Sequence, residues 1–244
     1  MKLLLTGARL IDPSQNLDSR LDIFIENGKI AKIGTNLIKA SKSRDTDKIT
    51  KIIDLPGMII VPGLIDMHTH LREPGYEYKE TIASGAAAAV AGGFTSIACM
   101  PNTLPVNDSR SVTEFIIRKA AEVSLAHVYP IGAISINSAG SQLTEFWDLK
   151  EAGIVALSDD GRPVMDAALM RRALEYAHSL QLPVISHCED INLSASGLMN
   201  EGYFSTILGL RGIPSIAEDI IVARDILIAE YTRTALHIAH VSTT

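Results

Sequence analysis

The sequence predicts an α/β fold, namely a (β/α)8 barrel of which about six strand–helix units are present, preceded by a small β unit. From residue 58 onward, short apolar runs alternate with longer helical patterns, which indicates a parallel sheet covered by helices. Residues with functional side chains stand where these apolar runs end, and such a barrel places its active site there. An open doubly wound sheet is the alternative, but the sequence lacks the Gly-rich phosphate loop that usually follows its first strand.

Residues 1–57 are expected to form the small β unit. An alternating apolar and polar run at 21–26 is followed by Asn27-Gly28 and a second apolar run at 29–33, which is a strong hairpin signal. Further strands are predicted at 3–5 and 52–55, and the polar stretch 39–51 is predicted to be a loop. We therefore divide the chain into residues 1–57, part of a β-sandwich, and residues 58–244, the incomplete barrel.

The barrel part is predicted from its periodicity and its capping signals. Gly92-Gly93 ends the first helix, and Ser111 with Glu114 has the spacing of a capping box at the start of the second. The expected helices are 79–91, 111–125, 143–152, 166–180 and 217–231, and the expected strands after the first are 94–100, 128–134, 154–157, 183–186 and 235–241.

Composition narrows the class of protein. The chain has 244 residues, 47% of them hydrophobic, and a formal net charge of −6, so it has enough apolar residues for a core and no basic run for nucleic acid. No stretch reaches the roughly 18 apolar residues of a membrane span, and the N-terminus is too quickly polar for a signal peptide. Cys99 and Cys188 are far apart in sequence and form no disulfide framework. We therefore expect a cytoplasmic protein.

His68 and His70 are the strongest functional signal. They follow the apolar run 58–61, and residues i and i+2 of a strand share a face, so both imidazoles are expected to point the same way. Two imidazoles in this arrangement are half of a metal site. The alternative is a pair of histidines on a solvated strand, which the apolar character of the preceding run disfavours.

Asp160, His187 and His240 stand at the ends of three later predicted strands. Taken alone, Asp160 is consistent with a turn, and His187 and His240 are consistent with buried histidines. Together with the first pair, the three residues predict a metal centre. Imidazole and carboxylate suit zinc, with iron, manganese or cobalt as competitors. Five ligands exceed what one tetrahedral ion with an open position needs, which favours two ions bridged by Asp160. Two such ions favour hydrolysis, or its reverse, at a carbonyl.

Other polar residues divide into candidate substrate binders and non-ligands. Arg72 closely follows the two histidines and Asn102 lies just past the next strand, and a guanidinium beside an amide suits a substrate carboxylate. The alternatives are a surface salt bridge for Arg72 and a turn residue for Asn102. The three remaining histidines do not follow the strand-end pattern and are expected to be non-ligands: His127, His178 and His237.

The motif around the histidine pair resembles a known signature. Residues 62–70, Pro62-Gly63-Leu64-Ile65-Asp66-Met67-His68-Thr69-His70, resemble that of the amidohydrolase superfamily. Residues from about 55 to the end resemble dihydroorotase of the bacterial long-chain type more narrowly. The segments that carry this resemblance are 70–75, 79–82, 92–95, 100–103, 158–161, 187–190, 199–202, 208–214 and 240–243.

The resemblance implies the reversible cyclisation of N-carbamoyl-L-aspartate to L-dihydroorotate in pyrimidine synthesis. It implies that His68 and His70 bind one zinc ion, that His187 and His240 bind the other, and that Asp160 bridges them. It further implies that His70, Arg72 and Asn102 hold the substrate carboxylate. The family's barrel has eight strands, so we expect that this chain is truncated, that the catalytic base, an aspartate, lies beyond Thr244, and that the chain alone is inactive.

Two alternatives and several partners are implied as well. A hydantoinase-like or allantoinase-like cyclic amidohydrolase is one alternative, although hydantoinases use a carbamylated lysine as the bridge and this strand end carries none. The second is a non-catalytic subunit that supports aspartate transcarbamoylase, which the presence of all four histidines disfavours. The expected partners are carbamoyl aspartate or dihydroorotate, further copies of the chain, and aspartate transcarbamoylase as a candidate.

Overall fold

The computed structural model describes residues 2–37 and 51–243. The loop predicted at 39–51 lies outside the described residues apart from Lys51. The chain forms two compact units, Met1–Gly63 and Leu64–Thr244. The first unit extends past residue 57 because the short strand β7 (Ile59–Ile60) pairs with β2 (Arg9–Asp12) of that unit. A domain boundary between residues 57 and 58 stays a prediction.

The first unit consists of two small sheets. Its Asn27-Gly28 turn joins β4 (Asp22–Glu26) to β5 (Lys29–Gly34), and both turn residues have the positive φ that a two-residue hairpin requires. This confirms the predicted hairpin. One sheet has the order β5-β4-β1-β6, with β1 at Lys2–Thr6 and β6 at Lys51–Asp54, and the other has the order β3-β2-β7, with β3 at Leu17–Arg20 after the 3-10 turn η1 (Pro13–Gln15).

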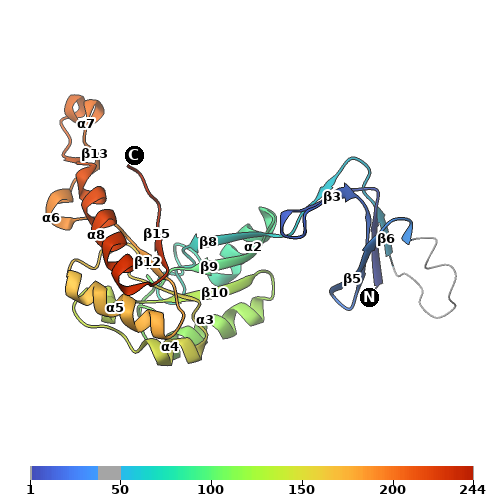
Figure 1. The fold of residues 1–244 in the computed structure, drawn as a ribbon, viewed down its shortest axis with the longest axis horizontal. Coiled ribbons are helices and arrows are strands. Elements are labelled where there is room, and N and C mark those ends of the chain that lie inside the picture. Colours follow the sequence, from blue (N-terminus) through green and yellow to red (C-terminus); the bar gives the residue numbers. More distant parts are fainter. Residues whose placement is uncertain (1, 38–50, 244) are drawn as a thin grey trace. The chain divides into compact units, whose positions relative to one another are not determined.

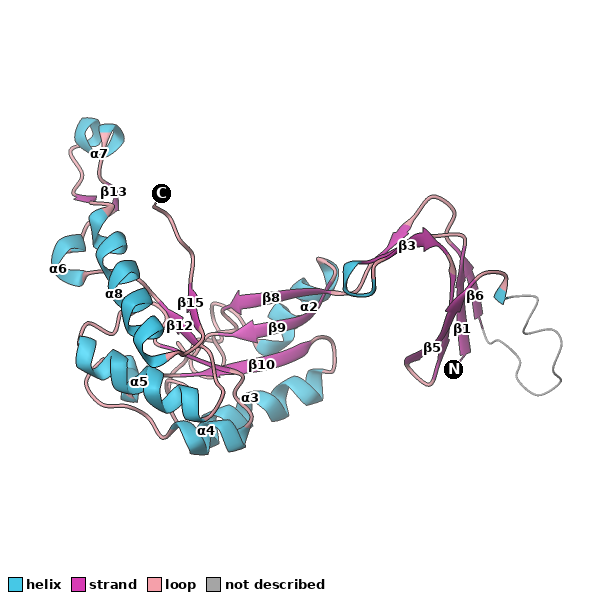
Figure 2. Ribbon diagram, viewed as in Figure 1, coloured by secondary structure: helices cyan, strands magenta, loops and turns pink. Residues whose placement is uncertain are grey.

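The second unit is built on a six-stranded sheet in which strands that follow one another in the sequence are neighbours in space. Every pair is parallel, and the curved sheet is visible in Figures 1 and 2. A doubly wound sheet would reverse its strand order at a switch point, so this order confirms the predicted partial barrel. The strands are β8 (Leu64–Thr69), β9 (Phe94–Cys99), β10 (His127–Gly132), β11 (Ala156–Ser158), β12 (Val184–Ser186) and β15 (Leu236–Ile238).

Helices connect these strands and lie along the outer side of the sheet (Figure 2). They are α2 (Ile82–Ala91), α3 (Arg110–Val123), α4 (Phe146–Ala152), α5 (Ala167–Ser179) and α8 (Ile216–Thr232). The sequence did not indicate the shorter elements, which are η2 (Ile136–Ser138), α6 (Ile191–Ser194), β13 (Met199–Asn200), α7 (Tyr203–Leu208) and β14 (Gly212–Ile213). Among the described residues, no helix combines the length and apolar character that crossing a membrane requires.

The start of α3 differs from the prediction. Its N-cap is Ser109, whose backbone is extended, and Ser111 already lies within the helix, so the predicted capping box with Glu114 does not form. The carbonyl oxygen of Ser109 accepts a hydrogen bond from the Thr113 amide, which places the first turn earlier than expected. A capping box does form at α2, where Thr81 and Ser84 each bond to the backbone of the other.

The core of the second unit lies between the sheet and its helices. Phe146 of α4 is fully buried and stacks on Tyr176 of α5, with ring centroids 4.8 Å apart. A second layer of small and apolar side chains fills the inside of the curved sheet, and it consists of Met100, Ile131, Ala156, Ile185 and Ala239. Both layers hold the strands in register and so fix where the strand ends lie.

Phe146→Ala is expected to lower the free energy of unfolding of this unit by about 3–5 kcal/mol, because it removes a buried aromatic ring and leaves a cavity. Urea-induced unfolding measures the loss. Trp147→Ala is the matched control, since Trp147 is the next residue and its side chain is 58% exposed, and it should change stability by less than about 1 kcal/mol. Equal losses in the two variants would contradict this view of the core.

Candidate metal centre

The five residues predicted as metal ligands come from four strands of one sheet. His68 lies within β8, His70 directly follows that strand, and Asp160 lies two residues after β11. His187 directly follows β12 and His240 lies two residues after β15. Because all of these strands are parallel, their carboxyl ends meet at the same edge. The fold therefore brings together residues that are up to 172 positions apart, from 68 to 240.

Four imidazoles converge on the Asp160 carboxylate. The Nε2 atoms of His68 and His240 lie 3.4 and 3.3 Å from Asp160 Oδ1. Nε2 of His70 lies 3.7 Å from Oδ2, and Nδ1 of His187 lies 3.8 Å from Oδ1. The facing nitrogens of His187 and His240 are themselves 3.0 Å apart. One carboxylate thus contacts every predicted histidine ligand.

These residues form two groups that could each hold a metal ion. The first is His68, His70 and Asp160, the second is Asp160, His187 and His240, and the ligand atoms within each group lie within 4.8 Å of one another. The donor set of imidazole nitrogens and one shared carboxylate fits a divalent transition metal. The Asp160 side chain is 6% exposed whereas the imidazoles are between 18% and 42% exposed, so the centre is open to solvent on the histidine side.

Outer contacts orient two of the imidazoles. Nε2 of His187 lies 3.3 Å from a carboxylate oxygen of Glu189, on the side away from Asp160. Nδ1 of His70 lies 3.1 Å from the amide oxygen of Asn102, whose amide nitrogen donates to Asp160 over 3.2 Å. A second partner of this kind fixes the tautomer of a metal-binding histidine. The sequence did not single out Glu189, because the strand ends at Ser186 and the shared-face rule that linked His68 and His70 does not apply beyond it.

The electrostatics of the centre favour an ionised Asp160. Burial acts to raise the pKa of this carboxyl, but its interactions with the nearby His187, His68 and His70 outweigh burial and bring the pKa to about 2. The interaction with Asp160 raises the pKa of His187, and burial lowers that of His68. The centre is therefore built around a permanent negative charge at neutral pH.

Arg72 lies in a loop rather than on the strand, because β8 ends at Thr69. Its φ of 61° is unusual for a residue other than glycine. The loop is held on both sides, since the Arg72 carbonyl accepts from the Tyr76 amide over 3.0 Å and the buried Glu73 carboxylate accepts from the Ile82 amide over 2.8 Å. Among the described residues, none forms a hydrogen bond or an ion pair with the Arg72 guanidinium, which leaves its donors available to a ligand.

The neighbouring Asp159 has a different role. It is 2% exposed and accepts hydrogen bonds from the amide and the hydroxyl of Ser135, so it fastens the loop after β10 to the end of β11.

The three histidines predicted to be non-ligands are exposed and belong to neither metal group of the described residues: His127, His178 and His237. An open hollow of about 680 Å³ borders the second group at His187 and His240.

A comparison with protein families matches residues 57–244 to the dihydro-orotase-like family. A dihydroorotase of Syntrophus aciditrophicus is 64% identical over 242 residues, which cover 99% of this chain and 55% of that protein. A dihydroorotase of Geobacter sulfurreducens is 55% identical over 243 residues, or 100% of this chain and 56% of that protein. The chain thus spans about half the length of the curated relatives it matches.

Solved structures share the fold at low sequence identity. An L-hydantoinase from Arthrobacter aurescens matches with a TM-score of 0.78 and 17% identity, over 98% of this chain and 53% of that one. A D-hydantoinase from Thermus sp. matches with a TM-score of 0.72 and 23% identity, over 98% of this chain and 52% of that one. The family match covers the whole sheet and every histidine of the centre, and the chain therefore belongs to the dihydro-orotase-like family.

Proposed function

We propose that the chain is part of a dihydroorotase, which interconverts N-carbamoyl-L-aspartate with L-dihydroorotate and water in pyrimidine synthesis. The observation that carries this proposal is that two groups of residues which could each hold a metal ion share Asp160. The names of the relatives at 64% and 55% identity support the substrate class. The forward reaction closes a ring between an amide nitrogen and a carboxyl carbon, and the reverse reaction adds water to a cyclic amide.

We propose zinc as the metal and two ions as the number. His68 and His70 would hold one ion, His187 and His240 the other, and Asp160 would contact both. Two such ions lower the pKa of a water molecule and polarise a carbonyl oxygen when they are bound. Asp160 and Asn102 hold the imidazoles in the orientation that this chemistry needs.

Arg72 is proposed as the residue that recognises the substrate carboxylate. Arg72 lies two residues after His70, and its guanidinium has no hydrogen bond or ion pair within the described part of the chain, so it is available for a bidentate ion pair. His70 and Asn102 are proposed as the other substrate contacts. In this structure their side chains contact each other and Asp160, so each would join metal binding to substrate binding.

The alternatives fit less well. A hydantoinase-like bridge requires a lysine, and Asp160 stands at the position that contacts all four histidines. A non-catalytic subunit has no need for a complete set of ligands, and both metal groups are intact here. Assembly with further copies of the chain or with aspartate transcarbamoylase, and a cytoplasmic location, are proposals that rest on the resemblance and on the two free cysteines.

His68→Ala in the full-length protein is expected to lower turnover by about 100-fold or more and to reduce bound zinc by about one ion per chain, because a ligand of the first group is lost. Steady-state kinetics and elemental analysis measure the two effects. His178→Ala is the matched control, since His178 is exposed on α5 and lies outside both groups. Unchanged turnover in His68→Ala, or less than one zinc ion per wild-type chain, would refute the proposal.

Arg72→Ala is expected to raise KM for the carboxylate substrate by about 10- to 100-fold, the size of a lost charge-assisted hydrogen bond, with a smaller change in kcat. The comparison is hydrolysis of an uncharged cyclic amide by the same variant, which should change little because that substrate has no carboxylate. If both substrates lose activity equally, Arg72 does not recognise the carboxylate.

A further inference from the structure

Two carboxylates of α8 are buried although the helix covers the outside of the sheet. Asp225 is fully buried and Glu218 is 9% exposed. The two residues are seven positions apart, which is close to two helical turns, so both lie on the helix face that packs toward the sheet. A buried charge is unfavourable unless hydrogen bonds compensate it, so the contacts of these two side chains indicate why they are there.

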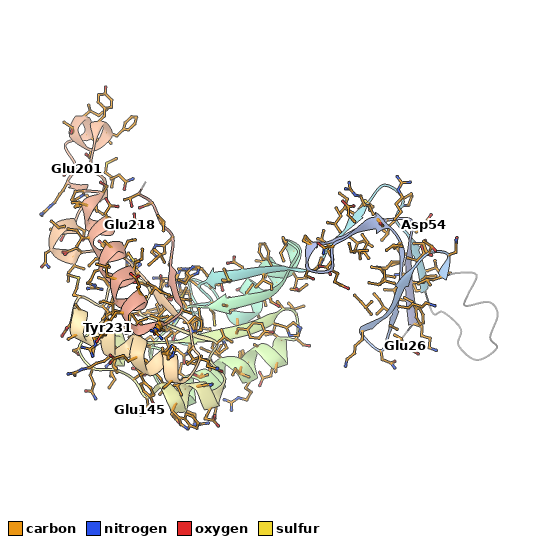
Figure 3. The ribbon with its side chains drawn as sticks, in the orientation of Figure 1. Glu26, Asp54, Glu145, Glu201, Glu218 and Tyr231 are labelled. Atoms are coloured by element: carbon orange, nitrogen blue, oxygen red, sulfur yellow. The ribbon has the colours of Figure 1, made fainter. Side chains whose placement is uncertain are left out.

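Glu218 holds the segment that follows β15. Its two oxygens accept from the Ser242 amide over 3.0 and 3.1 Å, and one of them accepts from the Ser242 hydroxyl over 2.7 Å. Ser242 is two residues after His240, whose φ of 35° lies in the left-handed region. Figure 3 shows Glu218 at the end of α8 that adjoins this segment. The carboxylate therefore fastens a strained backbone segment that carries a candidate metal ligand.

Asp225 holds the end of β12 in the same way. It accepts from the Ser186 hydroxyl over 2.6 Å, and Ser186 directly precedes His187. Its other oxygen accepts from Arg224 over 2.8 Å, and the same guanidinium donates to the carbonyl oxygens of residues 164–165. Every oxygen of the buried carboxylate is therefore paired, and the network joins α8, the end of β12 and the segment before α5.

Helix α8 holds the segment after β15 beyond the point where its strand pairing stops. The pairing of β15 with β12 ends at Ile238, two residues before His240. The Glu218 contacts reach Ser242, two residues after His240. Helix α8 thus supplies contacts at this strand end that the pairing of β15 with β12 does not give.

We propose that Glu218 and Asp225 are positioning residues that set the geometry of the second metal group, Asp160, His187 and His240, without touching the metal. This inference rests on the proposed metal centre. The two carboxylates act on this group only, because their contacts reach residues next to His187 and His240 in the sequence. His68 and His70 of the first group belong to β8, at the opposite edge of the sheet.

The test measures zinc binding to each group separately in the metal-free, full-length protein. His68→Asn leaves only the second group complete, and His187→Asn leaves only the first. Adding Glu218→Gln should weaken zinc binding about 10- to 100-fold in the His68→Asn protein, the usual effect of losing an orienting partner, and by less than about 2-fold in the His187→Asn protein. Competition with a chromophoric chelator measures both affinities.

Asp219→Asn is the matched control, because Asp219 is adjacent to Glu218, carries the same charge, and has no contact with Ser242 among the described residues. It should leave both affinities unchanged. Asp225 is fully buried, and a variant at that position can fail to fold. Ser186→Ala therefore tests its contact instead, since it removes one hydroxyl and leaves the Arg224–Asp225 pair in place. Like Glu218→Gln, Ser186→Ala should weaken zinc binding in the His68→Asn protein and leave it unchanged in the His187→Asn protein.

The outcomes separate the two proposals. If neither parent variant binds zinc, the metal centre itself is refuted and the positioning role falls with it. If both parents bind zinc and Glu218→Gln weakens the two groups equally, the carboxylate only stabilises the fold, and the positioning role is overturned while the metal centre stands. If Glu218→Gln leaves zinc binding unchanged in both parent variants, the positioning role is overturned as well. If zinc binding weakens only in the His68→Asn protein, the positioning role is supported.

Discussion

The contact of one buried carboxylate with four imidazoles is the interaction on which this centre depends. A carboxylate side chain that is 6% exposed is unfavourable unless donors or positive charges compensate it, and Asp160 finds its partners at the ends of β8, β12 and β15. These ends reach one point because the sheet is parallel, curved and ordered as in the sequence. The apolar layer inside the curve, which includes Ile131 and Ile185, therefore matters to the centre as much as the ligands do.

Much of the centre could be predicted because its signals are local. His68 and His70 share a strand face, and Asp160, His187 and His240 each follow a recognisable apolar run. The (β/α) alternation then places these runs at one edge of a sheet. The hairpin at Asn27-Gly28 was predictable for a similar reason, since the two residues that make the turn are adjacent in sequence.

The rest depends on contacts that short sequence windows do not contain. Glu218 and Asp225 look like ordinary charges of an outer helix, and only the packing of α8 against the ends of β12 and β15 buries them. The extended backbone of Ser109 moved the start of α3 away from Ser111, although both residues are good caps. Arg72 closely follows His70 in sequence, but β8 ends at Thr69 and the loop gives Arg72 a left-handed backbone, which the local sequence does not indicate.

Because both metal groups contain Asp160, a displacement of residues in one group affects the other. A shift of the segment after β15 moves His240, which lies 3.0 Å from His187 and 3.3 Å from Asp160. Because Asp160 also contacts His68 and His70, such a shift would disturb both groups unless something resisted it. The Glu218 and Asp225 contacts act next to His240 and His187 and oppose such a shift. Helix α8 thus supports the centre, although none of its side chains belongs to the two groups of residues that could hold a metal ion.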